Sequence, residues 1–485
     1  MLKFFVALLL SYTSSANAFN LIFASNIPRL TEVNETRSLA NLAGFIQNKR
    51  SQTSSFFIHG GDSLFPNALS VYDSGAHMVD VLNTIQTDVF LVNQREMAKG
   101  LDQLTMRTHE AEFPLVLSNV FDQRTSTNID GVLPYYSLAT PIGDVGFLML
   151  MSETVNSTYL TEDVVILDPI ERAEAFIHEM RSQGISHFVV VTEPDLLKLY
   201  PAERFSFADV LFVAAEVREG VRYHPDLIEV WGGGSSGNVA VVDWQKDDIR
   251  AHFESYSGAE IMPETEQMIQ RYVSHLGVVL EQPLGVLVTP MDSMRNSIRT
   301  QESAMGNLFS DALRSATRTD FAVLNGGAIR GNRQYRQGDK ISRRDIQNEL
   351  PFGGVVYKVK VLPMELKEIM EHSLSDVDNK AGRFLQVSGF EVGYDLSRPV
   401  GQRVLTLTSG GRPLMNREYW LAIPDYIKNG GDDYVIDANK VAREMSNQDR
   451  FVWNIVADYL VSLEVLTPKV EGRLRDQTVK NVTPQ

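Results

Sequence analysis

Short apolar runs alternate with amphipathic segments along the first half of the chain, and this alternation restricts the fold more than any other feature. The runs are apolar at successive positions, which is typical of strands covered on both faces. The segments between them have helical spacing, as in Leu39–Asn48, Ile170–Ser182 and Pro194–Leu199. A layered α/β domain is therefore expected from Leu21 to about Trp244. Its expected strands are Leu21–Ala24, Ser55–Ile58, Val89–Val92, Pro114–Leu117, Val145–Leu150, Phe188–Val191, Val210–Val213 and Asn238–Val242.

A second α/β domain is expected in the other half, because 485 residues are too many for one ordinary domain. Between the two halves, PETEQMIQRYVSHLGVVL has apolar residues at helical spacing and charges elsewhere, which predicts an interdomain helix. We place the first domain at 19–261, the linker helix at 262–284 and the second domain at 285–485. The elements expected in the second domain are the helices Ala304–Ala316, Pro363–Ser373 and Val452–Glu464 and the strands Phe321–Leu324, Phe390–Tyr394 and Val404–Thr408.

The N-terminus has the pattern of a secretory signal peptide. Lys3 precedes an apolar core from Phe4 to Leu10, and Ala16-Asn17-Ala18 forms a small-residue cleavage site. The apolar core is too short to cross a bilayer, and no later run of about 20 apolar residues follows, so no membrane span is expected. The sequence predicts a protein exported to the bacterial periplasm or beyond, after cleavage of residues 1–18 near Ala18. Without cysteine it has neither disulfides nor thiol chemistry.

The net charge of −16 argues against a nucleic-acid polymer as partner, because phosphate backbones are repelled. A small anionic ligand stays possible, since local arginines can hold it. The nine histidines show none of the close pairings that bind metals in short motifs, and neither a nucleophile elbow nor a P-loop occurs. The glycine-rich stretch Trp231–Asn238 is interpreted as a tight connection. From its residues alone, the first domain points to no reaction.

Three loops of the second domain suggest a ligand site. The strand that begins at Phe321 ends in Asn325, Gly326 and Gly327, and Arg330 follows. Two aromatic residues, Phe352 and Tyr426, lie on glycine-rich turns, where they can stack on a base for roughly 1–3 kcal/mol each. Asn325 can contact a polar ring edge, and Asp432 can accept from ribose hydroxyls. The other interpretation, ordinary glycine turns with half-buried aromatics, stays open at this point.

The order of these motifs resembles the C-terminal domain of the secreted 5'-nucleotidases, a family that includes UDP-sugar hydrolases. The resemblance extends over about 285–463 and rests on ESAMGNLFSDALRSAT, LNGGAIR, LPFGG, FLQVSGFEVGYDLSRPVG and NGGDDY. It implies a nucleoside whose base lies between Phe352 and Tyr426. The polar and backbone contacts that it implies are Asn325, Gly326, Gly327, Arg330 and Asp432, with Arg299 as a further, loosely aligned arginine.

The first half resembles the family's calcineurin-like metallophosphoesterase domain, which has four layers, α/β/β/α. In that family two metal ions about 3.5–4 Å apart activate a water molecule. Only Asp62 and Asn93 keep the family residue here. Asn26 and Pro28 replace an Asp-x-His pair, Gln94 replaces the catalytic histidine, Glu193 replaces a histidine ligand, and Glu216 and Arg218 replace a His-x-His pair. Proline has no donor atom, glutamine is no general acid near neutral pH, and a guanidinium repels a cation.

These substitutions predict a pseudoenzyme that binds a nucleoside or nucleotide and has lost the dimetal centre. No cofactor is then expected. In the alternative, Asp62, Asn93, Glu193 and Glu216, with His59 nearby, form a remodelled site for Mn²⁺, Mg²⁺, Ca²⁺ or Zn²⁺ in an active nucleotide phosphoesterase. A third possibility is a scaffold without nucleotide binding. The sequence names neither the base nor a protein partner.

Overall fold

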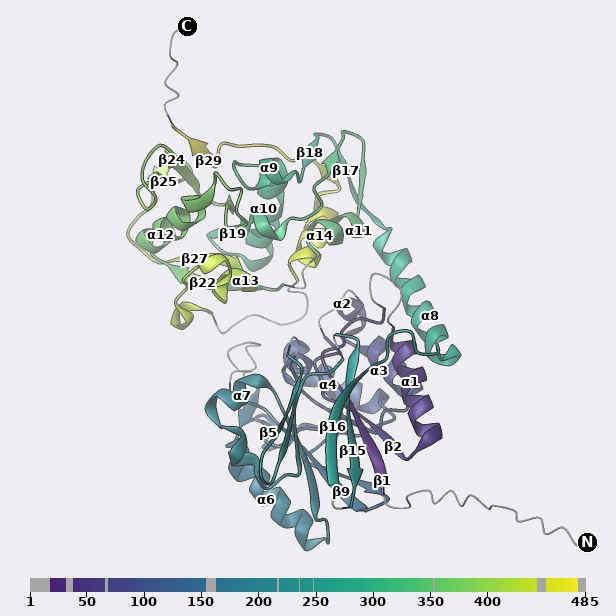
Figure 1. Cartoon of the computed structure of the whole chain (residues 1–485). Helices are drawn as coiled ribbons and strands as arrows, with labels where there is room; N and C mark the ends of the chain where they lie inside the picture. Colours follow the sequence, from purple (N-terminus) through teal and green to yellow (C-terminus); the bar gives the residue numbers. More distant parts are fainter. Residues whose placement is uncertain are drawn as a thin grey trace, which may run out of the picture. The chain divides into compact units, whose positions relative to one another are not determined.

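The structure is a computed structural model of the 485-residue chain. It describes residues 18–31, 38–65, 69–153, 163–215, 218–234, 236–246, 248–351, 354–442 and 451–478. The chain divides into two compact units, residues 1–273 and 274–485 (Figure 1). The expected signal peptide lies outside the described residues except for Ala18, which begins the first strand. No helix among the described residues is long and apolar enough to cross a bilayer.

The first unit contains two main sheets and a small one (Figure 1). The seven-stranded sheet has the order β16 (Asp248–Ser255), β15 (Asn238–Gln245), β1 (Ala18–Ala24), β2 (Ser55–His59), β3 (Val89–Leu91), β4 (Leu115–Val116) and β7 (Val132–Leu133). The six-stranded sheet has the order β13 (Gly220–Tyr223), β14 (Ile228–Trp231), β12 (Val210–Val213), β11 (His187–Thr192), β9 (Gly143–Leu150) and β8 (Tyr136–Thr140). The small sheet joins β10 (Val164–Ile166), β5 (Val120–Asp122) and β6 (Thr127–Asn128).

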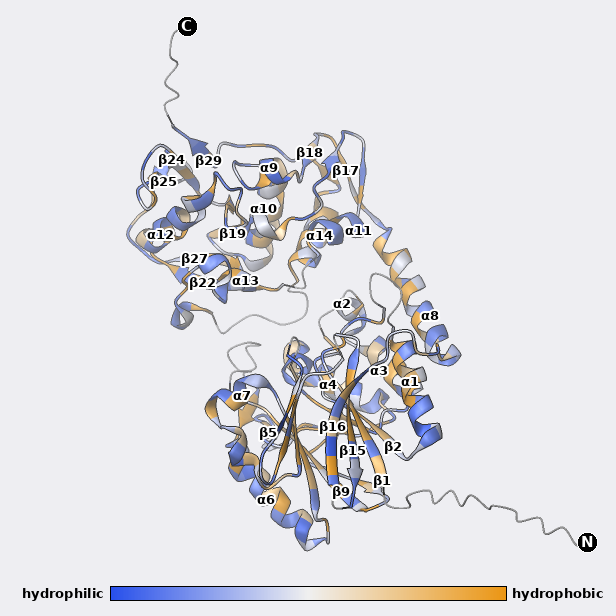
Figure 2. Cartoon of the chain, viewed as in Figure 1, coloured by the Kyte–Doolittle hydropathy of each residue, from blue (hydrophilic) through white to orange (hydrophobic). Residues whose placement is uncertain are grey.

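The two main sheets pack against each other, as the stacking of Phe23 on Phe212 shows: their rings, from β1 and β12, lie 4.2 Å apart. Helices cover the outer faces. The seven-stranded sheet carries α1 (Leu39–Gln52), α3 (Ala76–Ile85) and α4 (Leu101–Glu110), and the six-stranded sheet carries α6 (Pro169–Ser182) and α7 (Pro194–Leu199) (Figure 1). Figure 2 shows that the central strands are mainly hydrophobic while hydrophilic residues gather on the helices. The mixed α/β fold with two layers of sheet agrees with the sequence prediction.

Parallel strands bring the predicted positions together. Strands β1, β2, β3 and β4 are mutually parallel, as are β9, β11, β12 and β14. Loops that follow parallel neighbours emerge at the same edge of a sheet. Asn26, Asp62 and Asn93 therefore lie at one edge of the first sheet, and Glu193 lies at the corresponding edge of the second. The glycine-rich segment 231–238 connects β14 to β15, as predicted.

Helix α8 (Pro263–Leu280) contains the boundary between the two units. Its first half contacts the first unit: the Tyr272 hydroxyl donates to Asp80, and the Thr84 hydroxyl donates to Thr265 at 3.0 Å. Ile269 on the same face is fully buried. The amphipathic pattern in the sequence correctly located this helix.

The second unit has a four-stranded core sheet in the order β22 (Val356–Val361), β27 (Tyr419–Pro424), β19 (Phe321–Asn325) and β23 (Leu385–Ser388). A second sheet joins β26 (Arg412–Pro413), β25 (Val404–Ser409), β24 (Glu391–Tyr394) and β29 (Leu474–Asp476), and a third joins β21 (Lys340–Ser342), β17 (Pro283–Leu287) and β28 (Val465–Leu466). A short pair joins β18 (Met291–Asp292) to β20 (Gln334–Tyr335). The helices are α9 (Arg295–Ile298), α10 (Ala304–Thr317), α11 (Arg343–Glu349), α12 (Pro363–Ser373), α13 (Asp425–Lys428) and α14 (Val452–Leu463).

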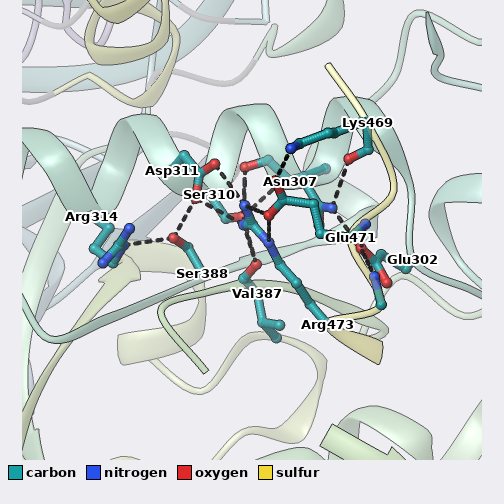
Figure 3. A network of polar contacts seen from close by, with 12 residues as sticks. Glu302, Asn307, Ser310, Asp311, Arg314, Val387, Ser388, Lys469, Glu471 and Arg473 are labelled. Atoms are coloured by element: carbon teal, nitrogen blue, oxygen red, sulfur yellow. Dashed lines mark hydrogen bonds and ion pairs between the residues drawn. The ribbon is translucent and has the colours of Figure 1, made fainter. Parts of the chain in front are cut away.

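A polar network fastens the last strand of this unit to α10 (Figure 3). Arg473 donates to both carboxylate oxygens of Asp311 at 2.8 Å and to the carbonyl oxygen of Val387 at 2.9 Å. The Glu302 carboxylate accepts the backbone amides of Glu471 and Gly472. Residues near the end of the chain are thus part of the core of the second unit.

Candidate functional site

The first candidate site lies where strands β2 and β3 end. Asp62 has a positive φ of 58°, and its Oδ1 accepts the backbone amide of Arg95 at 3.0 Å. Burial raises the pKa of Asp62 to about 7, and the negative charge of Glu96 adds to this rise. The side-chain oxygen of Asn93 accepts the backbone amide of Gln94 at 2.8 Å. Asp62 and Asn93 therefore each use a side-chain oxygen to accept a backbone amide of the loop that follows β3.

Glu96, which the sequence analysis did not single out, organises both loops. Its buried carboxylate accepts four backbone amides, from Asp62 (2.8 Å), Ser63 (2.9 Å), Leu64 (3.1 Å) and Asn93 (3.0 Å). A sequence signal was present: Asn93 and Glu96 have the spacing of a capping box at the start of a short 3₁₀-helix, Gln94–Lys99. Burial raises the pKa of Glu96, and the four amide hydrogen bonds oppose this rise. One buried carboxylate thus stabilises the conformation of both loops.

Glu193 has a structural role in this arrangement. One of its carboxylate oxygens accepts the amide of Ser152 at 2.7 Å, and the other accepts the amide of Leu196 at 2.9 Å. It is the N-cap of α7, whose first residue is Pro194. Both oxygens are engaged, although the negative charge of Glu193 still raises the pKa of Asp62.

His59 is buried between aromatic rings and is held neutral. Its ring stacks on Phe90 with centroids 4.8 Å apart, and burial lowers its pKa to about 3. Nδ1 accepts the Gly61 amide at 3.1 Å, so the proton of the neutral ring is on Nε2, which has no hydrogen-bond partner among the described residues.

On the opposite sheet, the Arg218 guanidinium lies 4.1 Å from the ring centroid of Trp231. Glu216 is outside the described residues. Within the described part of the chain, no group of three or more histidine, aspartate or glutamate side chains is arranged to hold a metal ion. The residues described here therefore do not fit the dimetal centre that the family resemblance implies.

The second candidate site lies in the second unit, at the end of β19. Asn325 is buried, and its side-chain oxygen has no hydrogen-bond partner among the described residues. A buried polar atom without a partner is rare and costs free energy. The next two residues are glycines because the backbone is crowded there: a Cβ at Gly326 would lie 2.7 Å from the Ile298 carbonyl oxygen.

The amides of both glycines donate hydrogen bonds within the chain. Gly326 donates to the Phe384 carbonyl oxygen at 2.7 Å, and Gly327 donates to the Gly382 carbonyl oxygen at 2.8 Å. These two bonds hold the 3₁₀ turn Gly326–Ala328, which follows β19, to the segment before β23. Their role here is to let three backbone segments meet beside Asn325.

Arg299, Arg330 and Asp432 gather near this junction. Burial lowers the pKa of Arg299, the like charges of Arg295 and Arg330 lower it further, and Asp432 opposes them. A Cβ at Gly382 would lie 3.2 Å from the Asp432 carboxylate. Positively charged side chains thus outnumber negatively charged ones among these neighbours of Arg299.

The loop that carries Asp432 has an unusual backbone. Asp432 and Asp433 both have positive φ, at 52° and 65°, which side chains other than glycine adopt at a cost. The carbonyl oxygen of Asp432 accepts from the His372 ring at 2.7 Å, and the ring of Tyr426 packs over Gly431. Tyr426 is 48% exposed, and burial of its hydroxyl region with the charge of Asp432 raises its pKa.

The structure therefore brings together Asn325, Gly326, Gly327, Arg299, Arg330, Tyr426 and Asp432, as one group on three loops. Phe352, the other aromatic residue of the predicted base site, lies outside the described residues.

Sequence comparisons agree with this division. The family model for the C-terminal domain of 5'-nucleotidase matches residues 282–438. Human 5'-nucleotidase is 25% identical over 92% of this chain and 87% of its own length. The chain is thus similar to 5'-nucleotidases along most of its length.

Other known proteins match over part of the chain or in fold alone. Bovine 5'-nucleotidase is 31% identical, over 44% of this chain and 40% of its own length. Among solved structures, a 5'-nucleotidase precursor from Thermus thermophilus superposes with a TM-score of 0.57 at 21% identity, covering 95% of this chain and 99% of that one. The NAD nucleotidase of Haemophilus influenzae has a TM-score of 0.65 at 13% identity, with the same coverage. These two structures share the metallophosphoesterase-like, two-domain fold with this chain.

Proposed function

We propose that this 5'-nucleotidase family protein binds a nucleoside or nucleotide in its second unit and has lost the dimetal hydrolytic centre of its relatives. It would then be a pseudoenzyme. The binding proposal rests on the buried side-chain oxygen of Asn325, which has no hydrogen-bond partner among the described residues and lies near Arg299, Arg330 and Asp432. A ligand with hydrogen-bond donors and an anionic group satisfies both features at once.

Each part of such a ligand has a suitable neighbour in the group. The exposed ring of Tyr426 offers one stacking face, and Phe352 is proposed as the other. A base donor can satisfy Asn325, ribose hydroxyls can donate to Asp432, and a phosphate can contact Arg299 and Arg330. The uneven charge distribution supports this: residues 274–485 contain 27 basic and 26 acidic side chains, while residues 1–273 contain 18 and 35.

The loss of hydrolysis is supported by how the first unit uses its remaining oxygen atoms. Glu193 caps α7, the Asn93 oxygen accepts from Gln94, and Pro28 offers no donor atom. Gln94 at the catalytic histidine position cannot supply a proton near neutral pH. Among the residues that the structure describes, too few oxygen or nitrogen ligands are left for a paired-metal cluster.

A thermal-shift and calorimetric titration of the full chain with nucleosides and nucleotides tests the binding. We expect binding by wild type, and a loss of about 5- to 100-fold in affinity for Phe352→Ala or Tyr426→Ala, from the stacking free energy. Arg299→Gln should weaken binding of nucleotides more than of nucleosides. The exposed Arg412 provides the matched control, because Arg412→Gln should change neither. Failure of every nucleoside and nucleotide to bind would leave the scaffold interpretation.

One observation favours the alternative of an active phosphoesterase. The carboxylates of Asp62, Glu96 and Glu193 lie close enough to raise the pKa of Asp62, and a divalent cation would relieve that repulsion. Glu216 would be the additional ligand. Phosphate release from AMP, UDP-glucose or a cyclic nucleotide with Mn²⁺, Mg²⁺, Ca²⁺, Zn²⁺ or Co²⁺, abolished by Asp62→Ala, would establish this enzyme. We expect no release above background.

We also propose that the protein acts outside the cytoplasm, on the basis of the signal pattern in residues 1–18. Cell fractionation with N-terminal sequencing of the mature chain tests this. A mature chain that begins near residue 19 in the exported fraction is the expected result.

A further inference from the structure

Glu349, the last residue of α11, has a fully buried carboxylate that no motif in the sequence explained. Its carboxylate accepts the Gly331 amide at 3.0 Å, the Ser293 hydroxyl at 2.9 Å and the Tyr335 hydroxyl at 2.7 Å. Burial raises its pKa, and these three hydrogen bonds act in the opposite direction. A buried carboxylate is costly unless its oxygens are fully hydrogen-bonded. Its presence therefore calls for an explanation.

The same residue fixes the backbone on both sides of Arg330. The Arg330 amide donates to the carbonyl oxygen of Glu349 at 2.8 Å, and the next amide, of Gly331, donates to the Glu349 side chain. These two amides belong to the two peptide groups that flank the Arg330 Cα. Only glycine fits at 331, because a Cβ there would lie 2.1–2.3 Å from the carboxylate atoms of Glu349. The direction in which the Arg330 side chain leaves the backbone is thereby set.

Two further segments with proposed nucleotide-binding residues lie near the Glu349 carboxylate. Ser293 precedes α9 and Arg299, and it pairs with Arg333: the Ser293 amide donates to the Arg333 carbonyl oxygen, and the Arg333 amide donates to the Ser293 hydroxyl, each at 2.9 Å. Glu349 itself stands three residues before Phe352. One carboxylate thus contacts the segment that leads to Arg299 and the segment that follows Arg330.

We propose that Glu349 is a positioning residue that fixes Arg330 for contact with the phosphate of a bound nucleotide. This inference rests on the proposed nucleotide-binding function. Glu349 touches no ligand; it acts through the two peptide groups beside Arg330. Its removal should therefore affect recognition of the phosphate and leave recognition of the nucleoside intact.

The test compares a nucleoside with its 5'-monophosphate, for example adenosine with AMP and uridine with UMP, by calorimetric titration of the full chain. For Glu349→Gln we expect the Kd of the monophosphate to rise about tenfold, the scale of one charge-assisted hydrogen bond. The Kd of the nucleoside should change less than about twofold. The matched control is Glu371→Gln. Glu371 is also buried in this unit and accepts the backbone amides of Arg403 and Val404, and its substitution should change neither Kd.

A double-mutant cycle with Arg330→Gln identifies the route of the effect. If Glu349 acts through Arg330, Glu349→Gln should weaken monophosphate binding no further in the Arg330→Gln protein. Additive losses, equal losses for nucleoside and monophosphate, or no loss would each overturn the proposal. If Glu349→Gln does not fold, Tyr335→Phe removes a single donor to the same carboxylate and should give a smaller loss with the same preference.

The two proposals fail in different ways. Binding of neither nucleoside nor monophosphate by wild type would overturn the proposed function and this inference together. Equal affinity of wild type for both ligands would leave nucleoside binding in place and overturn the phosphate role of Arg330 and, with it, that of Glu349.

Discussion

The backbone amide of Asn93 donates to the carboxylate of Glu96 at 3.0 Å, three residues further along the chain. The same carboxylate accepts three amides from the loop that begins at Asp62, so one buried side chain joins the loops after β2 and β3. The Glu96 carboxylate thus stabilises the conformation of both loops.

Glu96→Gln should destabilise the first unit by roughly 2–4 kcal/mol, because a neutral amide accepts more weakly and places its NH₂ against backbone donors. Urea unfolding followed by circular dichroism measures the change. The exposed Glu112 offers a control: Glu112→Gln should alter stability by less than about 0.5 kcal/mol. An unchanged urea midpoint for Glu96→Gln would show that the four amides do not depend on the charge.

Gln94→His alone should not restore hydrolysis. The substitution returns a proton donor, but Asn93 and Glu193 still use their oxygens in backbone hydrogen bonds, and Pro28 still has no donor atom. Phosphate release from AMP with each divalent metal measures the outcome. Metal-dependent turnover by this single variant would mean that a working metal centre remains.

The stability of the first unit should decrease in acid because of His59. Its pKa is about 3 in the folded chain and about 6.5 when unfolded, so the unfolded state binds the extra proton between these values. The contribution of neutral His59 to the free energy of unfolding is therefore complete above pH 6.5. It is lost as the pH falls toward 3, by up to roughly 4 kcal/mol. His59→Phe should lower the free energy of unfolding at pH 7 and should reduce its further decrease between pH 6.5 and pH 3. Urea midpoints at pH 7, 5 and 4 provide the comparison, and parallel curves for both proteins would contradict it.

Arg473→Gln should loosen the C-terminal strand. The change removes both bonds to Asp311 and the bond to Val387, for a loss of roughly 1–3 kcal/mol in a partly buried network. Hydrogen exchange of residues 471–476 should speed up while the first unit is unaffected. Arg412→Gln, on an exposed position of the same sheet, should have no such effect. If hydrogen exchange of residues 471–476 is unchanged in Arg473→Gln, the bonds to Glu302 alone hold this segment in place.

The sequence predicted the buried strands and the long helices well, because continuous apolar runs and helical spacing reflect burial directly. Helix α12 begins and ends at the predicted residues. Strand β16 was not predicted because it has no continuous apolar run, although the alternation of polar and apolar residues in DIRAHFES is typical of a half-exposed edge strand. Two-residue strands such as β4 are shorter than the apolar run that contains them, since pairing stops where the partner ends.

The sequence could predict features of the candidate sites that depend on residue type alone. It could not predict which hydrogen-bond donor each carboxylate oxygen accepts from, because that depends on the folded structure. The family resemblance implied Arg299, Arg330 and Asp432 as contacts of one ligand, and in the structure the charges of Arg330 and Asp432 act on Arg299. The N-cap role of Glu193 required coordinates, although Glu-Pro before a helix is a recognisable start signal. Glu349 was missed because a buried glutamate at the end of a polar helix looks like a surface residue in the sequence.

The lack of room between Gly331 and Glu349 has a consequence for descent. Substitution of either residue alone is unfavourable. A side chain at 331 would displace the Glu349 carboxylate, and a larger residue at 349 would displace the backbone at 331. Among related proteins that have arginine at the position of Arg330, glycine at 331 and glutamate at 349 should therefore occur together. Where one of the two is replaced, the other should be replaced as well.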